Sequence, residues 1–330
     1  MLIAGDIGGT KTLLALYTAE RGPRRPIAQA EFHSARYERL EDVVNDFLAQ
    51  SKARASVACF DVAGPVVGGR ARLTNLPWVI EEQPLRERLG LRRAILMNDL
   101  QATAYAVPRL QPDELHTILA GRAEPEGAIA VIAPGTGLGE AFLVRSGGEY
   151  LACASEGGHA DFAARDDLQG ELLRHLRARE SHVSVEHVCS GSAIPGIYAF
   201  LRDSGRAKDP APLAARLRDT QDLTPPIVEA ALADPHRNAL SALTLQVFVS
   251  ILGAEAGNLA LKVLATGGVY LGGGIPPRVL PQLQDGRFAR AFVDKGRFEP
   301  TMRAIPVHVI TTRAALLGAA MVGLRQLQAS

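Results

Sequence analysis

The stretch from Leu2 to Leu16 constrains the fold of this chain more than any other part of its sequence. An apolar run leads into a turn that contains Asp6, two adjacent glycines and Thr10, and a second apolar run leads out of it. This pattern predicts two strands joined by a tight hairpin. Adjacent glycines let backbone N–H groups converge on an anion, and Thr10 adds a hydroxyl donor. Asp6 can hold Mg²⁺ or its waters against a phosphate, so the hairpin is predicted to bind a metal-bound polyphosphate.

The spacing within this hairpin excludes two other phosphate-binding motifs. A P-loop has a lysine directly after its last glycine, whereas Thr10 precedes Lys11 here. A dinucleotide-binding fingerprint has a helix after its glycines, whereas the apolar run from Leu13 to Tyr17 continues as a strand. An ordinary glycine-rich hairpin without a ligand stays open for this motif taken alone.

Length, charge and cysteine content narrow the class of protein. The 330 residues suffice for two sizeable cores, and 47% hydrophobic with 22% charged residues is typical of a soluble globular protein. The net charge of +1 gives no reason to expect nucleic acid. The three cysteines, Cys59, Cys153 and Cys189, are widely spaced and form no zinc pattern. We therefore expect neither a nucleic acid partner nor a structural metal.

The sequence also predicts no membrane partner. Its beginning is a strand that contains Asp6 rather than the basic and apolar regions of a signal peptide. The most apolar helical segment, 239–254, is interrupted by polar residues and falls short of the ~20 apolar residues that span a bilayer. A cytoplasmic protein is expected.

Strands alternate with helices along the chain, which indicates an α/β fold with mixed sheets. After the first hairpin, strands are expected at 27–32, 55–63, 94–97, 128–133, 140–144, 269–274 and 304–310, and helices at 40–52, 84–89, 100–107, 169–179, 238–264 and 314–328. The segment 203–226 is polar and contains prolines, which is typical of short helices and surface loops.

A second strand–turn–strand element, with its glycine turn at 134–139, is built like the first. We interpret the two elements as an internal duplication with one phosphate-binding turn in each half. A small α/β domain is expected at 1–108 plus 312–330, and a large α/β domain at 109–311. Because no low-complexity linker separates them, the two domains are expected to share a cleft.

Several motifs in a fixed order resemble those of a known family. They are Gly5-Asp6-Ile7-Gly8-Gly9-Thr10, Thr74-Asn75 to Trp78, Asn98-Asp99, Ala133-Pro134-Gly135-Thr136-Gly137-Leu138-Gly139, Ser155-Glu156-Gly157-Gly158-His159, Glu186 and Gly267-Gly268-Val269-Tyr270-Leu271-Gly272-Gly273-Gly274-Ile275. With this ordered set the chain resembles the ATP-dependent glucokinases of the bacterial type, in the sugar-kinase/actin/Hsp70-like superfamily. The resemblance implies a two-lobed actin-like, ribonuclease H-like ATPase fold with internally duplicated mixed sheets. It also implies ATP and glucose as substrates, Mg²⁺ as cofactor and a homodimer.

The resemblance assigns the glycine turns to the nucleotide. The residues implied are Gly5, Asp6, Ile7, Gly8, Gly9, Thr10, Gly135, Thr136, Gly137 and Gly273. Asp6 is in addition associated with Mg²⁺. One departure from the family pattern follows Glu186, where Ser190-Gly191-Ser192-Ala193 replaces the Gly followed by Pro-Gly that relatives often have. This departure puts the contacts to the base or ribose in doubt.

By the same resemblance, Asp99 is the catalytic base that accepts the proton of the sugar 6-hydroxyl. Phosphoryl transfer goes through a loose transition state, so this proton needs to leave only as the new P–O bond forms. A carboxylate there also orients the attacking hydroxyl. The alternative is a helix N-cap, because Asp99 immediately precedes a predicted helix.

Asn98, Glu156, His159 and Glu186 resemble the sugar-binding residues of the family. Carboxylates accept strong hydrogen bonds from hydroxyl groups, and amide and imidazole groups can both donate and accept. Gly157-Gly158 lets the backbone fold tightly, so that Glu156 and His159 face one ligand. A solvated loop glutamate and a surface histidine are the alternatives. A zinc site at His159 is not expected, because the Cys-rich segment of the related repressor–ORF–kinase group is missing here.

Three other functions remain open. They are a kinase of another hexose such as mannose or an amino sugar, a non-catalytic sugar-sensing regulator on the same fold, and a pure ATPase or chaperone-like module. Regulators of this kind usually carry an added DNA-binding helical segment, whereas this chain begins directly at the phosphate hairpin. The set of Glu156, His159 and Glu186 disfavours a pure ATPase.

Overall fold

The computed structural model describes residues 1–73 and 76–328, so Thr74 and Asn75 of the motif that ends at Trp78 lie outside the described residues. The chain forms two compact units. Unit 1 comprises Met1–Gln111, Ser146–Ala154 and Thr312–Ser330, and unit 2 comprises Pro112–Arg145 and Ser155–Thr311. The division at 111/112 and 311/312 lies near the expected domain boundaries, while the short segment 146–154 was not expected in the first unit.

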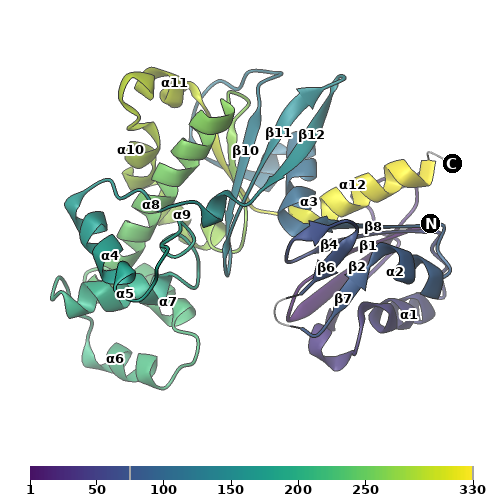
Figure 1. The fold of residues 1–330 in the computed structure, drawn as a ribbon, viewed down its shortest axis with the longest axis horizontal. Helices are drawn as coiled ribbons and strands as arrows, with labels where there is room; N and C mark the ends of the chain where they lie inside the picture. The colour runs from purple at the N-terminus through teal and green to yellow at the C-terminus, as the bar shows by residue number, and fades with distance from the viewer. Residues whose placement is uncertain (74–75, 329–330) are drawn as a thin grey trace. The chain divides into compact units, whose positions relative to one another are not determined.

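Unit 1 is built on a five-stranded sheet with the strand order β3-β2-β1-β4-β8 (Figure 1). Its strands are β1 (Leu2–Ile7), β2 (Lys11–Tyr17), β3 (Ala28–His33), β4 (Val57–Val62) and β8 (Arg93–Asn98). The neighbours β3, β2 and β1 are antiparallel, whereas β1, β4 and β8 run parallel. A small second sheet consists of β5 (Val66–Val67), β6 (Arg70–Arg72) and β7 (Val79–Glu81).

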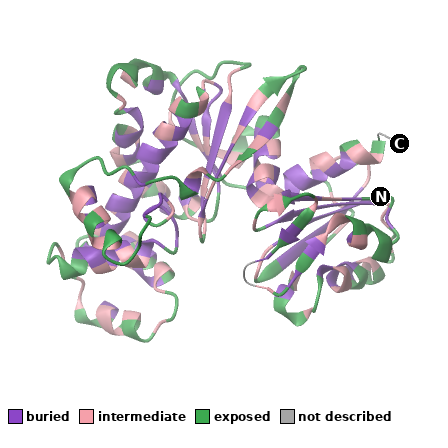
Figure 2. Ribbon diagram, viewed as in Figure 1, coloured by how far each residue is buried: buried purple, intermediate pink, exposed green. Residues whose placement is uncertain are grey.

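Helices cover both faces of this sheet because its central strands are apolar on both sides. Ile3 and Leu14 belong to a core with α1 (Leu40–Ser51) and α2 (Glu82–Arg88). The residues next to them in the same strands, such as Ala4 and Ala15, point to the opposite face of the sheet. They pack against α3 (Asp99–Ala106) and α12 (Ala314–Gln328). The burial of β1 and β2 in Figure 2 follows from this two-sided packing.

Unit 2 contains a six-stranded sheet with the strand order β12-β11-β10-β13-β14-β9. Its strands are β9 (Leu115–Leu119), β10 (Ile129–Pro134), β11 (Leu138–Ser146), β12 (Glu149–Ser155), β13 (Val269–Leu271) and β14 (Val307–Ile310). Without β9, this order repeats that of unit 1: the hairpin β10–β11 is antiparallel and β10, β13 and β14 are parallel. The predicted α/β fold with internally duplicated mixed sheets is therefore confirmed.

The long helix α8 (Ala239–Val263) is the centre of the core of unit 2. The other helices of this unit are α4 (Asp167–Arg177), α5 (Ile194–Asp203), α6 (Ala211–Arg218), α7 (Thr224–Ala233), α9 (Leu280–Leu283), α10 (Arg287–Val293) and α11 (Glu299–Ala304). By length and composition α8 is able to cross a membrane, but 78% of its most apolar window is buried inside the structure. Figure 2 shows it as a core helix.

Short 3₁₀ helices connect several of these elements: Ser34–Arg36, Val107–Arg109, Pro112–Glu114, Gly157–His159, Pro276–Val279 and Gly296–Phe298. One predicted strand, 304–310, is shorter than expected and begins at Val307. Pro306 precedes it and has no N–H to give to a sheet ladder, and α11 extends to Ala304. The polar segment 203–226 contains α6 and the start of α7, as expected for short helices.

Candidate functional site

The first glycine turn joins β1 to β2 and is held from beneath by a serine. Ile7 pairs with Thr12, and the N–H of Gly8 donates to the carbonyl of Lys11 at 2.9 Å. The buried Ser34 hydroxyl donates to the carbonyl of Gly8 at 2.9 Å and lies 3.0 Å from the hydroxyl of Thr12. Nothing in the sequence pattern singles out Ser34, because its contact depends on the pairing of β3 with β2.

The predicted nucleotide residues of this hairpin differ in their surroundings. Thr10 is exposed and Gly8 and Gly9 are partly buried in the turn. Gly5 and Ile7 lie inside β1, where Gly5 is enclosed by Leu14 and Phe60. The neighbouring Lys11 ammonium forms an ion pair with Glu31 at 2.6 Å.

Two carboxyl groups lie side by side where β1 and β4 end. Asp6 is in register with Asp61, which is fully buried. Burial raises the pKa of Asp61 well above its ordinary value, and the carboxylates of Asp6 and Asp99 raise it further. Burial also raises the pKa of Asp6, while hydrogen bonding with Asp61 and the charge of Arg313 lower it. The two carboxyl groups therefore interact, and burial favours the protonated form of Asp61.

Asp61 was not identified as a site residue from the sequence. A signal was present, because a carboxylate inside the apolar strand at 55–63 is unusual. Both of its oxygens are buried without a hydrogen-bond partner among the described residues, which disfavours the charged form of this carboxyl group.

Asn98 and Asp99 lie where β8 ends and α3 begins. The Asn98 Oδ1 atom accepts from the N–H groups of Leu100 and Gln101 at 2.9 and 3.2 Å, and its Nδ2 donates to the carbonyl of Gly64 at 3.0 Å. The N-cap of α3 is therefore Asn98. The alternative that Asp99 is the N-cap is wrong, because Asp99 is the first residue of the helix itself.

Asp99 is a partly buried carboxylate with an altered acidity. Its Oδ1 accepts from the N–H of Leu100 at 2.8 Å. Burial raises the pKa of Asp99 to about 6, the charge of Asp6 adds to this rise, and the hydrogen bonds from Leu100 and Asn98 oppose it. A carboxylate with this pKa is ionised at neutral pH and is a stronger base than an ordinary aspartate.

The oxygen atoms at the end of β1 fit Mg²⁺. This ion prefers oxygen ligands and usually keeps several waters with one or two carboxylates. Asp6 offers such a carboxylate, and the buried Asp61 supports it. The described residues contain no group of three or more His, Cys, Asp or Glu side chains that could enclose a metal, so the donor set suits a hydrated ion held from one side.

The second glycine turn, between β10 and β11, is braced by three other segments. The N–H of Gly191 donates to the backbone carbonyl of Gly135 at 2.8 Å. The hydroxyl of Ser192 donates to the backbone carbonyl of Thr136 at 2.9 Å. Gly273 has φ +81°, and a Cβ there would lie 2.5 Å from the carbonyl oxygen of Pro134. The segment in which the sequence departs from the family pattern therefore supports this turn.

Glu186 reaches the same turn from the side. Its Oε2 accepts from the N–H of Leu138 at 2.8 Å, and a Cβ on Gly137 would lie 2.4 Å from this oxygen. The N–H of Glu186 donates to the carbonyl of Gly158 at 2.9 Å. Glu186 thus connects the second glycine turn to the loop that follows β12.

That loop presents two of the predicted sugar-binding side chains. Glu156 and His159 are exposed, and their carboxylate and Nε2 atoms are 3.9 Å apart. The N–H of Val185 donates to the carbonyl of Ala160 at 2.9 Å, which aligns this loop with the segment before Glu186. Unit 2 therefore brings together Glu156, His159 and Glu186, whereas Asn98 belongs to unit 1.

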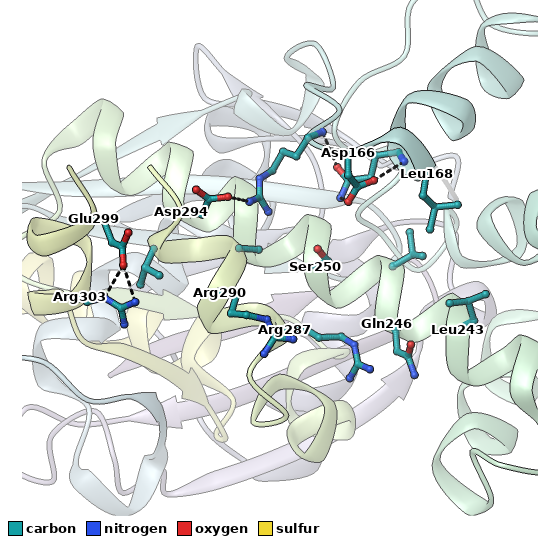
Figure 3. A pocket seen from close by; sticks show the side chains of 15 residues that line it. Asp166, Leu168, Leu243, Gln246, Ser250, Arg287, Arg290, Asp294, Glu299 and Arg303 are labelled. Atoms are coloured by element: carbon teal, nitrogen blue, oxygen red, sulfur yellow. Dashed lines mark hydrogen bonds and ion pairs between the residues drawn. The ribbon is translucent and has the colours of Figure 1, made fainter. Parts of the chain in front are cut away.

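A cavity of about 560 Å³ in unit 2 contains none of the predicted site residues (Figure 3). It is lined mainly by α8 and α10 and by charged side chains. Several of these neutralise one another: Arg303 pairs with Glu299 at 2.7 Å, and Arg165 pairs with Asp294. The predicted chemistry is located instead at the strand ends and turns described above.

Comparisons with known proteins agree along the whole chain. The glucokinase family model matches residues 3–326. A glucokinase of Nostoc punctiforme is 40% identical over 338 residues, which cover 98% of this chain and 99% of that protein. The crystal structure of a glucokinase from an Antarctic psychrotroph has a TM-score of 0.83 at 32% identity and covers 98% of both chains. A ROK family glucokinase from Streptomyces griseus, solved in complex with glucose and AMPPNP, shares the fold with a TM-score of 0.64 at 20% identity and covers 98% of this chain and 99% of that one.

Proposed function

The chain belongs to the glucokinase family, and we propose that it transfers the γ-phosphoryl group of ATP to the 6-hydroxyl of glucose, giving glucose 6-phosphate and ADP. The full-length similarity to glucokinases supports this activity. The observation that carries the mechanism is that Asn98, and not Asp99, caps α3. Because Asn98 caps α3, the carboxylate of Asp99 is not required for the cap and keeps an oxygen for a substrate.

Asp99 acts as the general base in this proposal. Its carboxylate accepts a hydrogen bond from the 6-hydroxyl, orients the oxygen toward the phosphorus atom and takes the proton as the P–O bond forms. The pKa of about 6 keeps Asp99 ionised at neutral pH. The proton of Asp61 remains on the fully buried carboxyl behind Asp6, so Asp61 itself does not meet the substrate.

The glucose hydroxyls are bound by Asn98, Glu156, His159 and Glu186. Glu156 and His159 are exposed and therefore free to turn toward a ligand. Glu186 uses one carboxylate oxygen for the second glycine turn and has the other for a sugar hydroxyl. A site of charged acceptors discriminates against sugars that lack a hydroxyl, because the acceptor is then left unpaired.

The phosphates of ATP are bound by backbone N–H groups of the two hairpin turns, those of Gly9 and Thr10 in the first and of Thr136 and Gly137 in the second. The N–H groups of Gly8 and Gly135 close the turns themselves, by hydrogen bonds to the carbonyls of Lys11 and Gly137. Gly273 lies beside the second turn and faces the nucleoside. When bound beside Asp6, Mg²⁺ supplies positive charge to the phosphate oxygens. Gly5 and Ile7 support the first turn from within β1.

The protein works as a cytoplasmic homodimer in this proposal. The burial of α8 inside unit 2 supports a protein that does not use this helix as a membrane anchor.

A coupled assay of ADP release across glucose, mannose, glucosamine and N-acetylmannosamine tests the activity. Glucose is expected to give the highest kcat/KM, and ADP release without any sugar is expected to be slow. A sugar other than glucose with a higher kcat/KM, or equal ADP release with no sugar present, contradicts the assignment.

A further inference from the structure

Two buried carboxyl groups lie outside the machinery described so far. Glu140 on β11 and Glu255 on α8 are only 2% and 6% exposed. The Oε1 atoms of both have no hydrogen-bond partner among the described residues, and the two carboxyl groups lie close enough for Glu255 to raise the pKa of Glu140. Buried polar atoms without partners are rare and costly, so this pair requires an explanation.

A shared proton satisfies both groups. Two carboxylates offer only acceptors and repel one another, whereas a carboxylic acid beside a carboxylate forms a strong hydrogen bond. The pKa of Glu140 is raised to about 7, mainly by burial and also by Glu255, while the charge of Lys262 opposes the rise. The Oε2 of Glu255 accepts from the Asn258 amide at 3.0 Å, and the Lys262 ammonium lies 3.6 Å from its Oε1. These contacts give the Oε2 of Glu255 a hydrogen-bond donor and place a positive charge near its Oε1, whereas the Oε1 of Glu140 has no partner among the described residues.

The remaining groups around the pair do not replace that proton. The Cys189 thiol lies in the field of both carboxyls, and burial raises its pKa well above the ordinary value, so it stays neutral. The Lys295 ammonium donates to Asn258 at 2.7 Å and to the carbonyl of Ala254 at 3.0 Å.

Glu140 also forms the floor of the loop that presents Glu156 and His159. A Cβ on Gly157 would lie 1.9 Å from the Oε2 of Glu140, so the backbone of the loop rests directly on this carboxyl group. A change in the charge or position of Glu140 therefore acts on the backbone between the two exposed side chains.

We propose that Glu140 and Glu255 share one proton and that this pair is a positioning device that holds the loop at residues 156–159 in its glucose-binding conformation. This inference rests on the proposed function, because it assigns the loop to glucose. Loss of the shared proton places two negative charges together beneath the loop and loosens it. Glucose binding is then weaker at alkaline pH, while kcat and the KM for ATP change little.

The test compares Glu140→Gln with Glu140→Leu, with the exposed Glu180→Gln as control. In the wild type, a difference of one pKa unit between the glucose-bound and free protein raises the glucose KM about tenfold between pH 6 and pH 9. Glutamine keeps a donor toward Glu255 and does not titrate, so this rise is expected to disappear while the KM at pH 6 stays within about twofold of the wild type. Leucine fills the space without a donor and is expected to raise the glucose KM about tenfold or more at every pH.

Hydrogen exchange of residues 155–160 gives a readout that does not need activity. After correction for intrinsic rates, protection is expected to fall from pH 6 to pH 9 in the wild type and to stay constant in Glu140→Gln, even if Glu140→Leu fails to fold. Equal protection profiles in wild type and Glu140→Gln, or a glucose KM that follows KCl concentration rather than pH, would overturn the shared proton. A protein with no activity on glucose contradicts the proposed function alone, since the exchange experiment still decides the role of the pair.

Discussion

The two sheets repeat one strand order but place different side chains beside their turns. The fifth residue of β1 is Asp6, and the fifth residue of β10 is Ala133. On the next strand, β4 places Asp61 beside Asp6, whereas the chain after β13 places Gly272 beside β10, with its N–H donating to Ile132 at 2.9 Å. The difference teaches that the shared scaffold determines where a turn lies, while the neighbouring side chains determine what chemistry the turn can perform.

Unit 1 thus concentrates carboxyl groups at its strand ends, and unit 2 leaves the same positions small and neutral. Three acids of unit 2 that the site and its support use lie away from these positions: Glu140 on β11, Glu255 on α8 and Glu186 after His182. We expect proton transfer and metal binding to depend on unit 1, and the contacts of Glu156, His159 and Glu186 with the sugar to depend on unit 2.

The largest expected effect tests whether proton transfer depends on Asp99 in unit 1. Asp99→Asn keeps the size of the side chain and leaves the cap at Asn98 intact, so stability and substrate binding should change little. Removal of the proton acceptor should lower kcat by about 10²–10⁴-fold. Steady-state kinetics and thermal unfolding measure the two effects, with the exposed Asp113→Asn as control. A near-normal kcat in the folded variant would remove Asp99 from catalysis.

Variants of Glu156 and Glu186 test whether these side chains of unit 2 bind the sugar. Glu156→Ala should raise the glucose KM about 10–100-fold, the worth of a hydrogen bond to a charged group, and leave the KM for ATP unchanged. Glu186→Ala should raise both constants, because Glu186 also accepts from Leu138 in the second glycine turn. Initial rates over both substrates separate these outcomes, with Glu180→Ala as control. An unaltered glucose KM in both variants would exclude them from the sugar site.

The activity at acidic pH tests the role of Asp99 in unit 1. Since the pKa of Asp99 is raised to about 6, protonation should inactivate the base below that pH. In the free enzyme, kcat/KM for glucose should fall about tenfold per pH unit on the acid side. The pH profile of Asp113→Asn should match the wild type. A profile that is flat down to pH 5 contradicts the raised pKa.

The buried Asp61 leads to a smaller effect on stability. Its folded-state pKa is raised, so its contribution to folding is fully present below its unfolded pKa and is lost as the pH rises through its folded-state pKa. Asp61→Asn keeps a hydrogen-bond donor toward Asp6, and because asparagine does not titrate, its contribution to stability does not fall as the pH rises. Its melting temperature at pH 8 should rise by about 2–4 °C for each kcal/mol gained, with no gain near pH 3. Thermal unfolding followed by circular dichroism provides the measurement, and a lower melting temperature at pH 8 would show that Asp61 is ionised.

The sequence predicted most elements of the fold because glycine turns and apolar runs are strong local signals. The first hairpin and α12 lie where expected. The outer strands β9 and β12 were not predicted, since their alternating, partly exposed residues depend on pairing with distant segments. The ordered motifs could be read from the sequence, but the residue that caps α3 could not. Whether Asn98 or Asp99 caps α3 depends on backbone geometry that two adjacent cap-forming residues leave open.

The contact of α12 with β1 has a consequence for the synthesis of this protein. The apolar face of the first sheet that includes Leu2 and Ala15 is covered by Leu316 and Ala320, which the ribosome adds near the end of translation. At ~5–20 residues per second, the first 111 residues emerge roughly 10–40 s before residue 312. During that interval the nascent chain exposes the part of this face that α12 covers in the complete protein and α3 leaves open, so it should attract chaperones until the last helix arrives. Chains that end before residue 314 should be degraded rather than released as partly active enzyme.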